Sequence, residues 1–249
     1  KKKLDEGKNQ LIYKRVPADL DTAVSLMIKL TKNKKNSFLL ESVTGGEIKG
    51  RYSVIGMDPD LIWECFGETS RIKTKSQKKF SSFKKCKQNP LLVLRKILAE
   101  TKVDIPKSLP QMAAGLFGFI GYDMIRLVEH LPNINPDVLK LPDAVMIRPQ
   151  LIIIIDGVKN EIIIVSPVWV KKSKDPKFEY RTALKKIASI VKKMQSKIKR
   201  SQPISTVKTF QNKPKSNVSK SEYLKTVLKA KDYIKKGDIF QVVPSQRWS

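Results

Sequence analysis

Few residues of the types that carry catalysis occur in this sequence. It contains one histidine, His130, and two cysteines, Cys65 and Cys86, among 249 residues. Two cysteines without CxxC spacing indicate neither a zinc site nor a disulfide framework. A single histidine excludes a metal-binding histidine cluster and leaves at most one imidazole base. His130 ends the stretch YDMIRLVEH. We interpret it as a residue at the C-terminal end of a helix, where its cation suits the helix dipole.

A second group of chemically useful side chains lies in the stretch FLLESVTGGEIKGRYSVIG. Glu41 and the hydroxyl of Ser42 offer hydrogen-bond partners, and Ser53 follows on the returning segment. Leu39 and Leu40 offer apolar contacts, although strand alternation sends them to opposite faces. A small ligand site needs this combination of an apolar wall and a few polar groups.

The same residues also have a purely structural interpretation. Ser42 and Ser53 can bond backbone groups within a hairpin, and Glu41 can pair with Lys49 or Arg51 across the turn. Residue chemistry alone favours this interpretation, because charged hairpins are common.

Elements that could position these residues follow from the hydrophobic pattern, which predicts antiparallel hairpins separated by helices. Strands are expected at residues 37–43, 51–56, 61–66, 71–75, 143–156, 160–170 and 238–243, and helices at 19–32, 89–100, 177–200 and 219–237. The stretch from Met112 to Leu131 is expected to begin as a strand and pass into a helix. The helix ends carry capping residues: Asp19 or Asp21, Asn89 before Pro90, the Ser219–Glu222 box, and Gly237 as a stop.

Three helices have an apolar stripe that we expect to be buried. In the helix at 177–200 it comprises Phe178, Leu184, Ile187, Ile190, Val191, Met194 and Ile198. In the first it comprises Leu20, Ala23, Val24, Met27 and Ile28, and in the last Tyr223, Leu224, Val227, Leu228 and Ile234. Near the end of the chain, Pro244 should end the strand. Arg247 could contact an anion or form a structural ion pair.

The formal charge of +27 suggests a nucleic-acid partner, but three features argue against it. The positive excess is spread along the chain, the cations are mostly lysine with nine arginines, and no RNA-binding or zinc-finger signature occurs. Arginine is the residue that recognises bases and phosphates bidentately. No run approaches the 18 apolar residues of a membrane span, and the N-terminus lacks a signal-peptide core. We therefore expect a soluble cytoplasmic protein without nucleic-acid or membrane partners.

Three stretches, in this order, carry a resemblance to a known family. They are FLLESVTGGEIKGRYSVIGMDPD, GLFGFIGYDMIRLVE, and GDIFQVVPSQR with its preceding helix. Together they resemble component I of anthranilate synthase, the first enzyme of tryptophan biosynthesis, from about Tyr13 to Trp248. The resemblance implies an α+β fold of antiparallel β-sheets flanked by helices, incomplete at the C-terminus.

The resemblance also implies a domain organisation. Residues 1–200 correspond to an N-terminal regulatory domain, 201–218 to a polar linker, and 219–249 to the start of a truncated chorismate-binding domain. The catalytic residues and the glutamates that bind Mg²⁺ are expected beyond Ser249. The partners of the predicted strand at residues 238–243 are expected there as well.

The implied activity is conversion of chorismate and ammonia to anthranilate and pyruvate, with a glutamine amidotransferase subunit (component II) as partner. Tryptophan is the family's feedback inhibitor and binds around an LLES motif that is followed, after ten intervening residues, by serine. This pattern recurs here and implies tryptophan contacts at Leu40, Glu41, Ser42 and Ser53. By itself, the chain is expected to be inactive. Two alternatives are component I of aminodeoxychorismate synthase and a stand-alone tryptophan-binding module without catalysis.

Overall fold

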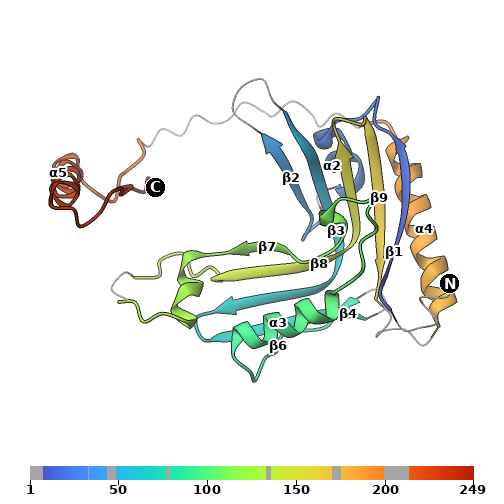
Figure 1. The fold of residues 1–249 in the computed structure, drawn as a ribbon, viewed down its shortest axis with the longest axis horizontal. Helices are drawn as coiled ribbons and strands as arrows, with labels where there is room; N and C mark the ends of the chain where they lie inside the picture. Colours follow the sequence, from blue (N-terminus) through green and yellow to red (C-terminus); the bar gives the residue numbers. More distant parts are fainter. Residues whose placement is uncertain are drawn as a thin grey trace. The chain divides into compact units, whose positions relative to one another are not determined.

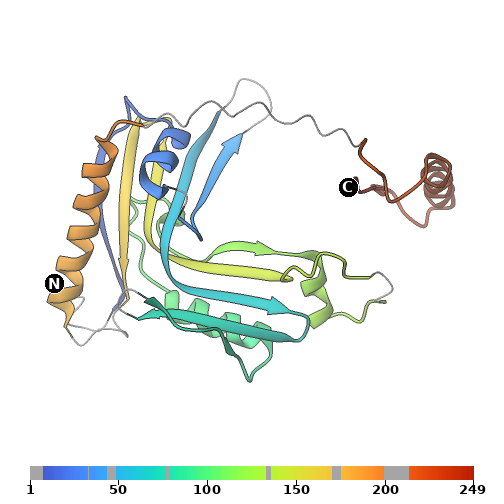
Figure 2. The same ribbon diagram turned by 180° about the vertical axis from the view of Figure 1, so that it is seen from behind.

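The computed structural model describes residues 8–32, 34–43, 49–76, 79–132, 136–169, 175–198 and 213–249. The chain divides into two compact units, Lys1–Ile198 and Lys199–Ser249. The first unit contains a β-sheet with its covering helices, and the second contains the helix α5 (Figures 1 and 2). No helix in the described ranges is long and apolar enough to span a bilayer.

An antiparallel sheet forms the first unit. In the described ranges it has nine strands, in the order β1-β9-β8-β3-β4-β5, with β2 paired to β3, β6 to β4 and β7 to β8. The strands are β1 (Gln10–Pro17), β2 (Phe38–Val43), β3 (Lys49–Phe66), β4 (Thr69–Ser76), β5 (Lys79–Phe80), β6 (Lys84–Lys85), β7 (Phe117–Ile120), β8 (Ala144–Asp156) and β9 (Glu161–Val168). The predicted α+β class with antiparallel strands is confirmed.

Two helices of the first unit lie between strands in the sequence, and the third follows the last strand, β9. They are α2 (Ala23–Thr31), α3 (Pro90–Thr101) and α4 (Pro176–Met194), with 3₁₀ turns at Gln111–Ala113 and Tyr122–Leu127. Asn89 caps α3 as predicted, since its side-chain oxygen accepts a hydrogen bond from the N–H of Leu91 at 2.9 Å. The α-helix expected after Gly121 is instead the second 3₁₀ turn. The lone histidine, His130, is exposed just beyond it.

The central strands β3 and β8 are long, and both bend. Their pairing shifts register between Pro59 and Leu61, where Pro59 lies opposite Pro149. A proline donates no ladder hydrogen bond, so two facing prolines weaken the sheet locally and allow it to turn. Figures 1 and 2 show β3 and β8 curving along their length, so that β2 and β7 lie in differently oriented parts of the sheet.

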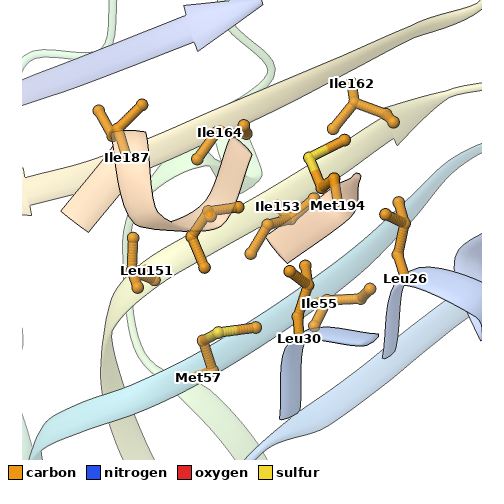
Figure 3. Packing of buried hydrophobic residues seen from close by; sticks show 11 residues of the cluster. Leu26, Leu30, Ile55, Met57, Leu151, Ile153, Ile162, Ile164, Ile187 and Met194 are labelled. Carbon is orange, nitrogen blue, oxygen red and sulfur yellow. The ribbon is translucent and has the colours of Figure 1, made fainter. Parts of the chain in front are cut away.

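Helices α2 and α4 cover one face of the sheet. Figure 3 shows their side chains meeting those of the strands in a buried cluster: Leu26, Leu30, Ile55, Met57, Leu151, Ile153, Ile162, Ile164, Ile187, Ile190 and Met194. A second buried cluster, with Val54, Ile152 and Ile154, is covered by residues 105–113. The third packs α3 against Leu61, Trp63 and Cys65 of β3. Strand β2 packs on the first two clusters, through Leu39 on the first and Phe38 on the second.

The start of α2 differs from the prediction. Its N-cap is Thr22, whose hydroxyl accepts from the N–H of Ser25 at 3.1 Å, and not Asp19 or Asp21. The carboxylate of Asp21 instead binds Lys29 at 2.7 Å. The helix buries Ala23, Leu26 and Leu30, whereas three residues of the predicted stripe, Leu20, Val24 and Ile28, are exposed. The segment is apolar on two sides, and only packing on the sheet decides which side is buried.

The second unit is formed by α5 (Lys220–Lys236) and the residues around it. The predicted capping box of Ser219 and Glu222 is present, and Gly237 ends the helix at φ 80°. The strand predicted at 238–243 is wrong, because these residues form no strand. An isolated β-bridge in this unit joins Ser216 and Trp248 instead. No strand in the described ranges pairs with this segment, and Phe240 is 95% exposed. The stripe of α5 that was predicted to be buried is wrong as well, since no residue of this helix is buried.

Candidate ligand-binding site

The four residues predicted to contact a ligand lie on β2 and on the first part of β3. These two strands pair antiparallel, with Leu40 opposite Val54 and Glu41 opposite Ser53. Residues that face each other across an antiparallel pair share one side of the sheet. The fold therefore brings Glu41 and Ser53 together, a pairing that the sequence analysis did not predict.

Successive residues of β2 point to opposite faces. Leu39 packs against the cluster beneath α2 and α4, whereas Leu40 lies beside Val54 on the other face and is 54% exposed. This confirms the predicted separation of the two leucines. Leu39 belongs to the core, so Leu40 is the leucine available to an added ligand.

Ser42 occupies an irregular part of the hairpin. The pairing shifts between Glu41 and Val43, so that Val43 lies opposite Lys49. The Ser42 side chain lies directly against Gly50, where any side chain would overlap its hydroxyl. Ser42 and Glu41 are both exposed, and Ser53 is half-buried.

One part of the structural alternative, a pair of Glu41 with Arg51, is not found. Another part, a pair of Glu41 with Lys49, lies outside the side chains that the structure describes. Arg51 does not pair with Glu41, because it binds the carboxylate of Asp156, with Nη2 and Oδ2 2.9 Å apart. Among the side chains that the structure describes, none forms a hydrogen bond or ion pair with the side chains of Glu41, Ser42 or Ser53. The carboxylate and both hydroxyls are therefore free to bind an added molecule on this part of the surface.

The ion pair of Arg51 and Asp156 lies beside the hairpin. Burial of the Asp156 carboxyl by itself raises its pKa, but the hydrogen bonds from Arg51 and from the N–H groups of Lys159 and Val158 together outweigh burial and lower it. The hydrogen bond to Asp156 raises the pKa of Arg51 in turn. The Arg51 guanidinium also lies 4.8 Å from the ring centroid of Tyr52. This pair holds the end of β3 against β8 next to the candidate site.

The described residues do not fit a magnesium site. No group of three or more histidine, cysteine, aspartate or glutamate side chains in those ranges could hold a metal ion. Mg²⁺ takes oxygen ligands in octahedral geometry, commonly one or two carboxylates together with several waters. Sequence reasoning also missed two glycines of β3, Gly50 and Gly56, which lie against β2. Their only signal was their position at the two ends of the GRYSVIG stretch.

The architecture defines an α+β protein built on one bent antiparallel sheet. It is similar to the crystal structure of anthranilate synthase component I from Streptococcus pneumoniae, with a TM-score of 0.60 and 20% identity over 94% of this chain and 48% of that one. At this identity the likeness shows the fold. Residues 35–249 match the family of chorismate binding enzymes, and the chain belongs to that family.

Two relatives show the closer relationship. The chain is 48% identical over 243 residues to anthranilate synthase component 1 of Cereibacter sphaeroides, covering 98% of this chain and 48% of the relative. It is 34% identical over 236 residues to the component 1 of Acetivibrio thermocellus, covering 93% and 46%. The resemblance predicted from the motifs is confirmed. The chain spans about half the length of these curated relatives and is homologous to their N-terminal half.

Proposed function

We propose that the chain is part of an anthranilate synthase component I, which forms anthranilate and pyruvate from chorismate and ammonia or glutamine. The observation that supports this most strongly is the 48% identity to a component 1 across 98% of the chain. Because the relatives are about twice as long, the proposal assigns catalysis to the whole protein. The 249 residues by themselves are expected to form no anthranilate.

The proposal divides the chain by role. Residues 1–200 form a regulatory domain, 201–218 a linker, and 219–249 the start of the chorismate-binding domain. A glutamine amidotransferase subunit, component II, supplies the ammonia, and Mg²⁺ binds to the part of the protein that corresponds to the second half of the relatives. The enzyme works in the cytoplasm.

The hairpin of β2 and β3 is proposed as the contact surface for tryptophan as inhibitor. Glu41 accepts from the ligand's ammonium group, the hydroxyls of Ser42 and Ser53 bond its polar groups, and Leu40 contacts the indole ring. These partners suit a zwitterion with an apolar ring. Leu40 and Glu41 lie on opposite faces of β2, so the ligand must bind around the edge of this strand. The exposure of the surface means that residues from elsewhere in the whole protein complete the site.

Activity is tested with a chimera. Residues 1–249 are joined to the second half of the Cereibacter sphaeroides component 1 and assayed with chorismate, ammonium and Mg²⁺. Fluorescent anthranilate is the expected product, and neither half alone should form it. A folded chimera that forms aminodeoxychorismate would assign the chain to the sister enzyme, and one that forms no product would contradict the proposal.

Binding is tested separately by titration calorimetry of the 249-residue chain with L-tryptophan. We expect saturable binding that is weakened by Ser42→Ala and by Ser53→Ala. Ser81→Ala serves as the control, because this exposed serine lies beyond the end of β5. Absence of heat at millimolar tryptophan would exclude the alternative of a stand-alone tryptophan-binding module, whereas an active chimera that tryptophan does not inhibit would contradict the site itself.

A further inference from the structure

Two glycines of β3 leave the space that side chains of β2 occupy. A Cβ atom at Gly56 would lie 2.2 Å from Cε1 and Cζ of Phe38. A Cβ atom at Gly50 would lie 2.0 Å from Oγ and 2.1 Å from Cβ of Ser42. Contacts this short do not occur between real atoms, because packed carbon atoms prefer separations of about 3.5–4.0 Å. Strand β2 can keep its present position only while both residues are glycine.

The two contacts restrict β2 in different ways. At Gly56 the obstacle is an aromatic ring, but this ring is stacked on Phe117 with centroids 4.9 Å apart and an interplanar angle of 29°. It therefore has little freedom to swing away. At Gly50 the obstacle includes the backbone oxygen of Ser42, which would lie 2.6 Å from the new Cβ. A side chain there must displace the strand itself, together with the Ser42 hydroxyl.

Leu40, Glu41 and Ser42 lie in the part of β2 that begins after the Phe38 contact and ends at the Ser42 contact. We infer that Gly50 and Gly56 are positioning residues of the tryptophan site. They let β2 approach β3 closely and so hold these three side chains at the distance from β3 that the ligand requires. The inference rests on the proposed function and deepens it. Neither glycine touches the ligand, since each acts through the β2 residue that covers it.

A matched control lies at the same end of the sheet. Gly157 follows β8, and a Cβ atom there would lie 3.5 Å from the carbonyl oxygen of Arg51, an ordinary contact. Gly157→Ala therefore tests the loss of a glycine beside the hairpin without displacing β2. A second control, Ile97→Ala, removes a buried side chain of α3 from a different cluster. It lowers stability without touching the hairpin.

The experiment measures the Kd of L-tryptophan for the 249-residue chain and its variants at a temperature at which circular dichroism shows each to be folded. Gly50→Ala and Gly56→Ala should each raise Kd at least tenfold. Gly157→Ala and Ile97→Ala should change it less than twofold. In the chimera, Gly50→Ala should raise the inhibition constant of tryptophan and leave kcat/KM for chorismate unchanged, which a general loss of structure would not do.

A rescue variant keeps the test decisive even if Gly50→Ala fails to fold. Phe38→Leu removes the ring that a Cβ at position 56 would strike, so Gly56→Ala with Phe38→Leu should bind more tightly than Gly56→Ala alone. Wild-type Kd in folded Gly50→Ala, or no recovery in the folded double variant, would overturn the positioning role and leave the proposed function intact. If the wild-type chain alone binds no tryptophan, the inhibition constant of the chimera decides instead. An active chimera that tryptophan does not inhibit would overturn the tryptophan site and the positioning role and leave the proposed synthase activity intact.

Discussion

Arg148 of β8 and Asp60 of β3 form a buried bidentate ion pair at the bend of the sheet. Nε and Nη2 of Arg148 each lie 2.8 Å from a carboxylate oxygen of Asp60, and the two side chains are 3% and 2% exposed. The ring of Trp169 lies 4.9 Å from the guanidinium carbon. The pair lies next to the facing prolines Pro59 and Pro149, where the ladder of hydrogen bonds is interrupted. It links β3 to β8 at the point where their pairing is weakest.

Arg148→Met should therefore lower the free energy of unfolding strongly. The substitution leaves the carboxylate of Asp60 buried without its guanidinium, and breaking a buried pair from one side costs about 3–5 kcal/mol. Urea unfolding followed by tryptophan fluorescence measures the change.

The control for this experiment is the neighbouring ion pair of Lys34 and Asp58. Its atoms are 3.2 Å apart and its side chains are 48% and 33% exposed. Lys34→Ala should cost less than about 1 kcal/mol, because solvent screens exposed pairs. Equal effects of Arg148→Met and Lys34→Ala would show that burial at the bend has no special role.

The candidate hairpin could be predicted from the sequence because its signals are local. Alternation predicted that Leu39 and Leu40 separate, and the glycine-rich turn predicted that the two strands form a hairpin. Each of these predictions depends only on residues within one hairpin. The register in the structure agrees with them.

The bend of the sheet could not be predicted in this way. Asp60 and Arg148 are 88 positions apart, and no local pattern indicates that they meet. The contacts of Gly50 with Ser42 and of Gly56 with Phe38 depend on the register shift and on ring packing. The strand at 238–243 was predicted from its composition, although a strand also requires a partner to accept its hydrogen bonds.

A second prediction concerns acid stability and the Arg51–Asp156 pair. The folded-state pKa of Asp156 is lowered below its ordinary value, so the pair contributes stability above about pH 4, the pKa of an unfolded aspartate. This contribution is lost as the pH falls from there through the folded-state pKa. The wild-type chain should therefore lose more free energy of unfolding between pH 6 and pH 3 than Asp156→Asn does.

Urea unfolding at both pH values measures this difference. The other carboxyl groups are common to both proteins and cancel in the comparison. An equal loss of stability in wild-type and Asp156→Asn would show that Arg51 does not stabilise the charged carboxylate.

A third prediction distinguishes the two cysteines. Burial raises the pKa of Cys65 to about 11, and the nearby charge of Asp143 acts in the same direction. Because only the thiolate reacts, Cys65 should be inert to a thiol reagent at pH 8. Cys86 is only half-buried and should be the thiol that reacts in the native protein. Cys86→Ser should abolish rapid labelling and Cys65→Ser should preserve it, whereas both thiols should react in urea.

The last prediction concerns Gly118 in β7. A Cβ atom there would lie 1.8 Å from the carbonyl oxygen of Val145 in the paired strand β8. This obstacle is backbone and cannot rotate away, so Gly118→Ala must push β7 from β8 along the Phe117–Ile120 ladder. Overpacking of this kind costs about 1–3 kcal/mol or more. The unfolding free energy should fall by that amount, and amide hydrogens of β7 should exchange faster. Gly157→Ala, with its ordinary 3.5 Å contact, should leave both quantities unchanged. Wild-type protection of the β7 amides in Gly118→Ala would contradict the close approach of the two strands.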